Sequence, residues 1–372
     1  MNLFKKKIKI AVAMSGGVDS SVAAALLAKQ GYDVTGVFMN FWLETSKDEL
    51  SSDEFANRRR SLEAEKTARG VCEKIGIPLY TLNAAREFKK AVVDYFLSEL
   101  KKGATPNPCV VCNKEIKFKL LLEKAESFGA DGVATGHYAR KLKVKSEKLK
   151  VEYHLLKARD QNKYQSYFLY NLTQSQLAKY LFPIGDYLKT DVRKMAKKFN
   201  LPAWNRPESQ EICFISDNDI KRFIGAHLDL TPGKILDKSG KVIGRHAGLP
   251  LFTIGQRHGM GIGGGAPYYA VKMDYKTREL IVTSNPKDKM LYRDSLIAEN
   301  VNWISGKMIL ETVKCKATIR YRHKPEEAII KPLSDGKCEV VFAAPQRAAA
   351  PGQSVVFYRR NEVLGGGVIG KL

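Results

Sequence analysis

The chain has 372 residues, which is more than one compact core usually holds, so we expect two or three domains. Apolar residues make up 44% and aromatic residues 9%, which excludes a mainly disordered protein. Lysine and arginine total 62 against 39 aspartate and glutamate residues, a net charge of +23. This excess favours a polyanionic partner. Because neither a spanning apolar stretch nor a basic helix with a rich apolar face is evident, nucleic acid is favoured and no membrane is expected.

Strand-like and helix-like runs alternate through the first half of the chain. The predicted strands are 8–14, 33–40, 79–83 and 131–135, and the predicted helices are 20–30, 61–75, 85–101 and 113–128. The first strand is an almost continuous apolar run, as in a strand buried on both faces. Alternation of this kind predicts an α/β domain with a parallel sheet between two layers of helices.

The pattern changes in the second half. An alternating stretch with a very basic turn predicts an antiparallel hairpin over 141–157, and a basic helix follows at 190–199. A turn at 237–240 and a glycine-rich loop at 259–265 belong to a small central domain. Short strands at 314–322, 326–332, 338–342 and 354–358 then predict a small C-terminal β-barrel or sandwich. We therefore expect domains at 1–210, 211–281 and 282–372.

The turn between the first strand and the first helix reads Ser15-Gly-Gly-Val-Asp-Ser20. Such a turn places unpaired N–H groups at the carboxyl edge of the sheet, and the two glycines let the backbone approach a phosphate. Asp19 would repel a bare phosphate, so we expect Mg²⁺ to bridge the two. The loop is neither a Walker A loop nor a dinucleotide fingerprint. It resembles the PP-loop of ATP pyrophosphatases, which adenylate a substrate. Met39 and Gly136 follow neighbouring strands and are expected at the same edge.

The six cysteines lie at positions 72, 109, 112, 213, 315 and 338. Their wide spread and the lack of a secretory leader favour a reducing, cytoplasmic location. Cys109 and Cys112 form a C-x-x-C motif, which indicates thiol or metal chemistry. We expect Asn113 to cap a helix, so that the helix start and nearby Lys114 and Lys117 lower the pKa of the Cys112 thiol. Taken alone, the apolar run around position 213 indicates a core cysteine.

Together these motifs resemble the tRNA-specific 2-thiouridylase family. The resemblance runs essentially end to end, and the segments that carry it are 14–22, 36–39, 105–108, 112–118, 134–140, 165–169, 212–215, 253–257, 268–271, 320–323, 351–353 and 364–367. The loop at 15–20 alone would not separate this family from GMP synthetase or lysidine synthetase. So many motifs in one order are specific to it.

The resemblance implies ATP-dependent 2-thiolation of the wobble uridine in tRNAs for lysine, glutamate and glutamine. It implies that ATP binds Ala13, Met14, Ser15, Gly16, Gly17, Val18, Asp19, Ser20, Met39 and Gly136. The uridine C2 oxygen then attacks the α-phosphate and pyrophosphate leaves. A persulfide on Cys213, loaded by a sulfur-relay protein or a cysteine desulfurase, delivers sulfur, and AMP leaves. Cys112 is implied as the second catalytic thiol, which releases the sulfur by forming a disulfide with Cys213.

The resemblance also implies where tRNA binds. The target base is flipped out of its stack, because its C2 atom is otherwise out of reach. The implied contacts are Asn107, Pro108, Cys109 and His137 around this base, and Lys163, Tyr164, Gln165, Arg320, Tyr321 and Gln353 elsewhere on the tRNA.

Two positions depart from the family pattern. Tyr164 stands where we expect aspartate, so a carboxylate that would contact tRNA or a neighbouring arginine is lost. Cys109 stands where many relatives carry aspartate, so Cys109, Cys112 and Cys213 could instead ligate an iron–sulfur cluster with one open site for hydrosulfide. The sequence leaves both sulfur routes open, and we favour the persulfide. Two rival functions are a PP-loop amidotransferase or synthetase, which would need no paired thiols, and an RNA-binding protein that keeps only the fold.

Overall fold

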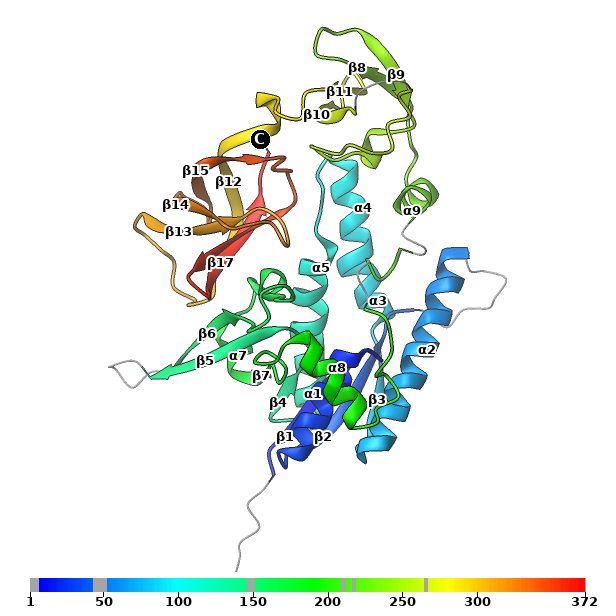
Figure 1. Ribbon diagram of the computed structural model, residues 1–372, viewed down its shortest axis with the longest axis vertical. Coiled ribbons are helices and arrows are strands. Elements are labelled where there is room, and N and C mark those ends of the chain that lie inside the picture. Colours follow the sequence, from blue (N-terminus) through cyan, green and yellow to red (C-terminus); the bar gives the residue numbers. More distant parts are fainter. Residues whose placement is uncertain are drawn as a thin grey trace, which may run out of the picture.

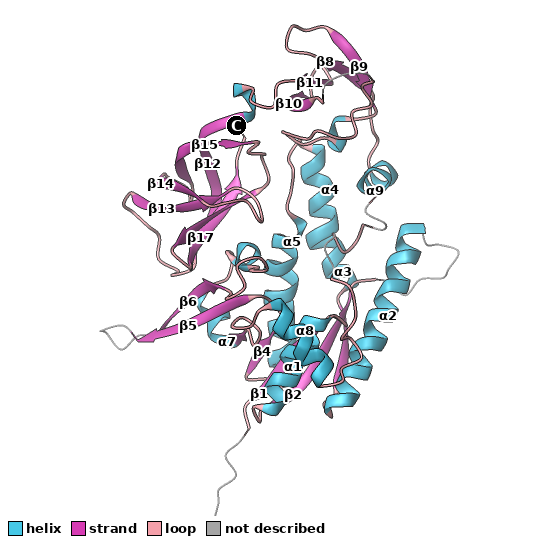
Figure 2. Ribbon diagram, viewed as in Figure 1, coloured by secondary structure: helices cyan, strands magenta, loops and turns pink. Residues whose placement is uncertain are grey.

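The computed structural model describes residues 7–42, 52–145, 151–208, 212–215, 219–263 and 267–371. It has three parts: a body of helices around a parallel sheet, a small β-rich part and a β-barrel (Figure 1). Most helices belong to the first body, and the barrel beside it consists of strands (Figure 2). The basic turn at 146–150 and the end of the glycine-rich loop, from 264 on, lie outside the described residues. Within the described ranges, no helix is both long and apolar enough to cross a membrane.

The first body is built on a five-stranded parallel sheet with the order β3-β2-β1-β4-β7. Its strands are β1 (Lys9–Met14), β2 (Asp33–Asn40), β3 (Leu79–Asn83), β4 (Gly132–Ala134) and β7 (Tyr180–Leu181). The strand order reverses between β1 and β4, and in open α/β sheets ligands bind at the carboxyl ends of strands at such a point. The predicted α/β fold class is confirmed.

Both faces of the sheet are covered. Ile10 and Val12 face a core shared with α1 (Val18–Lys29), α2 (Ser52–Ile75) and α8 (Lys189–Lys198), whereas Ala11 faces the other core. On that other side lie α5 (Pro108–Val111), a π-helical stretch (Cys112–Leu120), α6 (Leu121–Ser127) and α7 (Gln174–Lys179). A further helix consists of α3 (Ala85–Phe88), a π-helical turn (Lys89–Val93) and α4 (Asp94–Lys101). The burial of alternate residues on two faces is what an all-parallel sheet requires.

The C-terminal part is a closed barrel of six strands, because β12 pairs with both β15 and β17. Its strands are β12 (Tyr292–Trp303), β13 (Val313–Thr318), β14 (Glu326–Pro332), β15 (Cys338–Arg347), β16 (Ser354–Arg359) and β17 (Glu362–Ile369). In β17 a Cβ on Gly366 would lie 2.6 Å from the Val355 carbonyl oxygen and 2.9 Å from the Tyr170 ring. The glycines of β17 therefore permit close packing between the barrel and the first body.

The predicted hairpin is present and extends the barrel sheet. It consists of β5 (Ala139–Lys145) and β6 (Val151–Lys157), and β6 pairs with β17. The central part contains α9 (Ile220–His227) and a four-stranded sheet with the order β10-β11-β8-β9. Its strands are β8 (Gly233–Leu236), β9 (Val242–His246), β10 (Tyr269–Asp274) and β11 (Glu279–Thr283). Short 3₁₀ turns occur at Ser166–Leu169, Leu249–Leu251 and Lys289–Leu291.

Candidate active site

The glycine loop leaves β1 and enters α1 at the carboxyl edge of the sheet. The Ser20 hydroxyl accepts a hydrogen bond from the Ser15 backbone N–H at 3.2 Å and donates one to the Gly17 carbonyl at 3.2 Å, which fixes the curve of the loop. Gly16 has a φ of +71°, and a Cβ there would lie 2.3 Å from the Ala64 carbonyl oxygen of α2. Only glycine fits this position, so the loop rests directly on the α2 backbone.

The structure brings other predicted nucleotide contacts to the same edge. A Cβ on Gly136 would lie 2.6 Å from the Ser20 backbone nitrogen and 2.7 Å from the Asp19 carbonyl carbon, so the segment after β4 lies against the first turn of α1. Met39 is the second-last residue of β2, which pairs with β1. Binding of ATP by these residues stays a prediction. It requires that they lie at one edge of the sheet, and they do.

The Asp19 carboxylate is already bound on both oxygens. Lys189 Nζ lies 2.7 Å from Oδ1 and 2.8 Å from Oδ2, and the Tyr138 hydroxyl donates to Oδ1 at 3.1 Å. The Lys189 ammonium thus pairs with the carboxylate on which the sequence places Mg²⁺, and binding of Mg²⁺ by Asp19 stays a prediction. Among the described side chains, no group of three His, Cys, Asp or Glu residues forms a metal site.

A second carboxylate extends this ion-pair network. Glu208 Oε2 lies 2.6 Å from Lys163 Nζ, and Glu208 Oε1 lies 3.7 Å from both Lys189 Nζ and Arg193 Nη2. The hydrogen bond from Lys163 is the main cause that lowers the pKa of Glu208. Arg206 Nη1 lies 3.4 Å from the Gly16 carbonyl oxygen. Lys163, a predicted tRNA contact, is thus engaged within the protein, and cations gather around the loop.

The helix that carries the C-x-x-C motif begins earlier than the sequence predicts. Asn107 is its N-cap and accepts a hydrogen bond from the Val110 backbone N–H at 3.4 Å, with Pro108 in the first turn. Cys112 therefore lies inside a continuous helix and is 6% exposed. Burial raises the pKa of its thiol. The predicted helix start at Asn113 and the predicted lowering of this pKa are both wrong, because desolvation outweighs the nearby positive charge.

The helix is π-helical from Cys112 to Leu120, and Lys117 lies in this stretch. Residues five apart on an ordinary α-helix point about 140° away from each other, whereas the wider turn of a π-helix brings them to nearly the same side. Consistent with this, the positive charge of Lys117 acts to lower the pKa values of Cys109, Cys112 and Cys213 against the effect of burial. The charge of this one lysine therefore acts on all three thiols.

Cys213 lies on a short described segment beside this helix. Asn57 of α2 donates its side-chain amide to the Phe214 carbonyl at 2.9 Å, and the Phe214 ring packs edge-on against Phe88 and Phe96. Cys213 is an exposed residue, yet its thiol is desolvated, which raises its pKa to about 12; Cys112 is the next cause. All six cysteines are free thiols. The fold thus gathers Cys109, Cys112 and Cys213, as the prediction requires.

His137 follows Gly136 into the same region. Its Nδ1 lies 2.9 Å from the Thr135 hydroxyl, and its ring centroid lies 5.6 Å from that of Phe118. Burial, and then the charge of Lys117, lower its pKa to about 3. His137 is therefore neutral at physiological pH and can meet a base only as a hydrogen-bond partner, not as a cation.

Several predicted tRNA contacts hold parts of the protein together. Gln165 Oε1 accepts from the Tyr138 backbone N–H at 2.9 Å, and Arg320 Nη2 donates to the Arg347 carbonyl at 2.6 Å. Tyr321 packs on Phe168, with ring centroids 4.6 Å apart. Their role in tRNA binding stays a prediction.

Tyr164, the residue in place of the expected aspartate, contacts a buried lysine. Lys157 Nζ lies 4.8 Å from the Tyr164 ring centroid and 4.2 Å from that of Tyr358. Two aromatic faces thus stabilise this cation where a carboxylate could have done so.

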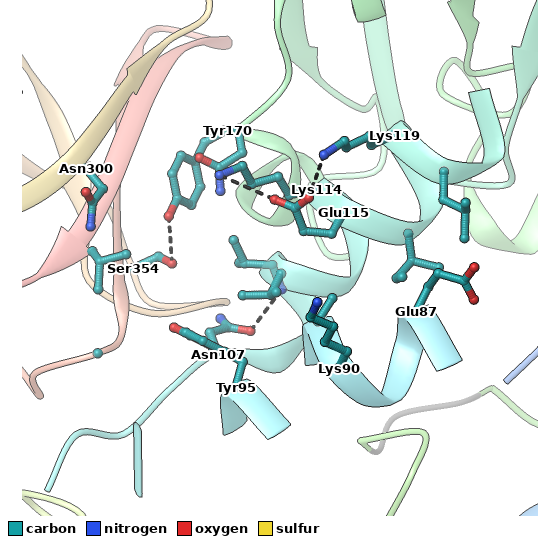
Figure 3. Close-up of a pocket in the computed structure, with 18 of the residues that line it drawn as sticks. Glu87, Lys90, Tyr95, Asn107, Lys114, Glu115, Lys119, Tyr170, Asn300 and Ser354 are labelled. Carbon is teal, nitrogen blue, oxygen red and sulfur yellow. Dashed lines mark hydrogen bonds and ion pairs between the residues drawn. The ribbon is translucent and has the colours of Figure 1, made fainter. Parts of the chain in front are cut away.

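A cavity of about 780 Å³ opens between the first body and the barrel. Figure 3 shows Tyr170 pointing across this boundary to Ser354, whose hydroxyl oxygen lies 3.3 Å from that of Tyr170. Asn107 lines the cavity, whereas Cys109, Cys112 and Cys213 do not. The cavity is lined by equal numbers of lysine and glutamate residues, so it has no excess positive charge with which to bind a phosphate.

Sequence reasoning missed Lys189, Tyr138 and Asn57. The pairing of Lys189 with Asp19 joins residues 170 positions apart, so no local pattern signals it.

Three family models match consecutive parts of the chain. They are the tRNA methyl transferase HUP domain at residues 8–217, the tRNA methyl transferase PRC-barrel domain at residues 221–284 and the aminomethyltransferase β-barrel domain at residues 293–369.

Curated relatives match over nearly the whole length. The tRNA-specific 2-thiouridylase MnmA of Geobacillus thermodenitrificans is 46% identical over 370 residues, which cover 99% of this chain and 96% of the relative. The protein of the same name from Carboxydothermus hydrogenoformans is 46% identical over 365 residues, 98% of each chain. Among solved structures, NMN synthetase from Francisella tularensis aligns over 60% of this chain and 74% of its own, at 14% identity and a TM-score of 0.34. On its domain order and its full-length relatives, the chain belongs to the tRNA-specific 2-thiouridylase (MnmA) family.

Proposed function

We propose that this enzyme thiolates C2 of the wobble uridine in tRNAs for lysine, glutamate and glutamine, in an ATP-dependent reaction that uses a cysteine persulfide. Family membership establishes the coarser activity, tRNA uridine thiolation. One observation carries the finer proposal: the segment after β4 joins the nucleotide loop to the thiols. Gly136 lies against the first turn of α1, and the next residue, His137, shares Lys117 as a charged neighbour with the three cysteines.

The first chemical step activates the base. The uridine C2 oxygen attacks the α-phosphorus of ATP, a C–O–P linkage forms, and the bond to pyrophosphate breaks. An amide-like carbonyl resists substitution, and adenylation turns its oxygen into a leaving group. The loop N–H groups at the start of α1 and the cations around it suit a triphosphate.

The second step delivers sulfur. The outer sulfur of a Cys213 persulfide attacks C2, and AMP leaves with the former C2 oxygen. The Cys112 thiolate then attacks Cys213 Sγ, so that a Cys112–Cys213 disulfide forms and the transferred sulfur remains on C2 as the thiocarbonyl. A dithiol reductant restores both thiols. The charge of Lys117 supports this assignment, because it partly offsets the burial that raises the pKa values of Cys112 and Cys213.

An iron–sulfur cluster on Cys109, Cys112 and Cys213 is the second candidate route. The observation that favours it is that Cys109 joins the other two thiols in one neighbourhood, and each of Cys109 and Cys112 influences the pKa of Cys213. Thiolates suit iron, but the three thiols are not arranged as a metal site among the described side chains. We keep the persulfide route first, because Cys112 and Cys213 suffice for it.

We further propose the division of the chain into an ATP-binding catalytic domain at 1–210, a central domain at 211–281 and a tRNA-contacting barrel at 282–372. The net charge of +23 supports tRNA as the partner. The free state of all six thiols supports a reducing, cytoplasmic location.

The test is a reconstituted reaction. The protein is incubated with tRNA for lysine, ATP, Mg²⁺ and a persulfide-loaded sulfur-relay protein, and the wobble nucleoside is identified by mass spectrometry after digestion. We expect 2-thiouridine with equal amounts of AMP and pyrophosphate. Cys213→Ser is the matched control and should release pyrophosphate without thiolating the tRNA. The absence of tRNA-stimulated pyrophosphate release from the wild-type protein would refute the proposal.

A further inference from the structure

We propose that Lys189 is a phosphate ligand of the nucleotide loop, and that Asp19 serves as its anchor and not as a metal ligand. The proposal rests on ATP binding at the loop, which belongs to the proposed function. It assigns a site residue that lies far from the loop in sequence, at the start of α8.

The geometry around Lys189 holds its ammonium in one place. Its backbone N–H donates to Asp160 Oδ2 at 3.0 Å, which fixes the start of α8. Its Nζ reaches both oxygens of Asp19 at 2.7 and 2.8 Å. Only 10% of the Lys189 side chain is exposed, and the ammonium lies 5.7 Å from the centroid of the Tyr138 ring. A long side chain fixed in this way loses little further entropy on binding a ligand.

The position of this lysine is unusual for a purely structural ion pair. The first turn of α1 already carries the positive end of the helix dipole, which Asp19 alone would balance. A buried ammonium beside the start of α1 is repelled by the positive end of the helix dipole. The Asp19 carboxylate compensates for both positive charges. Positive charge gathered at a helix start beside free N–H groups is the arrangement that binds a phosphate.

Lys189 also keeps a donor for a ligand. An ammonium has three N–H groups, and two of them reach Asp19. The next anion, Glu208 Oε1, lies 3.7 Å from Nζ, which is an ion-pair distance and too long for a good hydrogen bond. Glu208 is itself bound by Lys163 at 2.6 Å. A phosphate oxygen can therefore take the third N–H without displacing Asp19.

The same geometry explains why Asp19 is needed beside a polyanion. It holds the Lys189 ammonium in place through two short contacts, and its charge balances that of the lysine before ATP arrives. During pyrophosphate release, the bond between the α- and β-phosphates breaks and negative charge builds up on the departing oxygen. A preorganised cation stabilises this charge without moving.

The experiment measures ligand binding and not turnover. The Kd of ATP is determined by equilibrium dialysis, in EDTA and across a Mg²⁺ titration, for wild type, Lys189→Gln and Asp19→Asn. We expect Lys189→Gln to weaken ATP binding in EDTA by about tenfold or more, the size of a charge-assisted hydrogen bond. Adenosine has no phosphate, so its Kd should be the same for both variants as for the wild-type protein. Asp19→Asn should weaken ATP binding but leave the Mg²⁺ midpoint unchanged.

Two further variants complete the design. Lys194→Gln, on the exposed side of α8, is the matched control and should bind ATP normally. Because Lys189→Gln leaves Asp19 unpaired, its fold is compared by thermal unfolding with the double variant Asp19→Asn/Lys189→Gln, in which both charges are absent. The double variant should regain stability and still bind ATP weakly.

The outcomes separate the two proposals. Unchanged ATP affinity in a folded Lys189→Gln or in the double variant overturns the inference. The inference is also overturned if the midpoint of the Mg²⁺ titration shifts in Asp19→Asn but not in Lys189→Gln, because Asp19 would then be the metal ligand. If the wild-type protein binds neither ATP nor adenosine, both in EDTA and at the highest Mg²⁺ concentration, the proposed function itself fails.

Discussion

The side-chain amide of Gln353, in the barrel, donates a hydrogen bond to the backbone carbonyl of Thr105 in the first body, 2.7 Å away. Thr105 also donates its backbone N–H to the Pro351 carbonyl at 2.7 Å, and its hydroxyl oxygen lies 3.2 Å from that of Thr253 in the central part. All three parts of the protein therefore meet at one residue. Because Thr105 lies two residues before Asn107, the N-cap of α5, this contact braces the helix that carries Cys112.

Removal of this brace should slow the reaction without weakening nucleotide binding. We expect Gln353→Ala to lower kcat for thiolation by about two- to tenfold, the range of one neutral hydrogen bond. The Kd of ATP should stay within about twofold, because the loop at 15–20 is held by α2 and not by the barrel. Single-turnover thiolation and equilibrium dialysis measure the two quantities. Gln346→Ala is the control, because its amide bonds within the barrel, to the Ala344 carbonyl at 2.8 Å. An equal loss of kcat in both variants would contradict a specific brace.

Serine variants of the three site cysteines separate the two sulfur routes. In the persulfide route, Cys112→Ser and Cys213→Ser lose nearly all thiolation, whereas Cys109→Ser keeps much of it, because Cys109 only borders the base. Thiolated tRNA is quantified after aerobic incubation with a persulfide donor. In the cluster route each thiolate is a ligand, so all three variants should be inactive. Equal inactivation, together with iron bound to anaerobically prepared wild type, would decide for the cluster.

Binding of tRNA should weaken steeply with salt. Six to ten phosphate contacts imply a loss of about 10³- to 10⁵-fold in affinity between 50 and 200 mM salt. A filter-binding titration of full-length protein with tRNA measures the slope. The net charge of +23 motivates the prediction. An affinity that does not change with salt would speak against tRNA as the partner.

The desolvated imidazole of His137 predicts a defined pH dependence of stability. The pKa of His137 falls from 6.5 to about 3 in the folded protein. Between these two values the unfolded chain binds the extra proton, so the free energy of unfolding must rise with pH there and level off above about pH 7. We expect a slope of up to about 1.4 kcal/mol per pH unit from this one residue.

The measurement compares wild type with His137→Asn by urea unfolding from pH 4.5 to 7.5. The difference in unfolding free energy between the two proteins should narrow as the pH falls, because His137→Asn has no proton to gain at this site. A difference that is constant over this range would mean that the imidazole is not desolvated in the native state.

The strands around the nucleotide loop were predictable from the sequence. The predicted bounds of β1, β2 and β3 lie within a residue of the structure. For β1 and β2 the reason is that a strand buried on two faces leaves a continuous apolar signal. The position of the loop between β1 and α1 followed directly. The PP-loop pattern was informative because its context, a strand before and a helix after, was also visible in the sequence.

The helix around Cys112 was mispredicted for a local reason. Proline at 106 and 108 indicated a loop, but proline in the first turn of a helix is favourable, and Asn107 is a good cap. The start of α2 at Ser52 was missed as well, nine residues before the predicted start, because its first turns are polar. The wrong position of the helix start also led to the wrong direction for the pKa of Cys112. This residue lies inside the helix and is buried, and burial raises the pKa of its thiol.

Contacts that join distant segments were beyond a local reading. The bonds of Lys189 to Asp19 and of Asn57 to the Phe214 carbonyl span 170 and 157 positions. The bounds of β12 and β17 were not predicted, although these strands close the barrel, because their charged residues and glycines obscure the alternation. Only the fold brings these residues together.

The pairing of β6 with β17 makes the three parts of the chain hard to separate. The hairpin belongs in sequence to the first body, yet Leu155 and Leu156 of β6 pair with the last strand of the barrel, and the Lys157 N–H is bonded to the Asn361 carbonyl at 2.7 Å. A shortened chain that ends after the central part would expose β6 as an unpaired edge next to the half-exposed Leu142 and Val151. Such an edge recruits strands from other chains. Expression of the catalytic body alone should therefore give aggregates, and the whole chain must fold before the edge is protected.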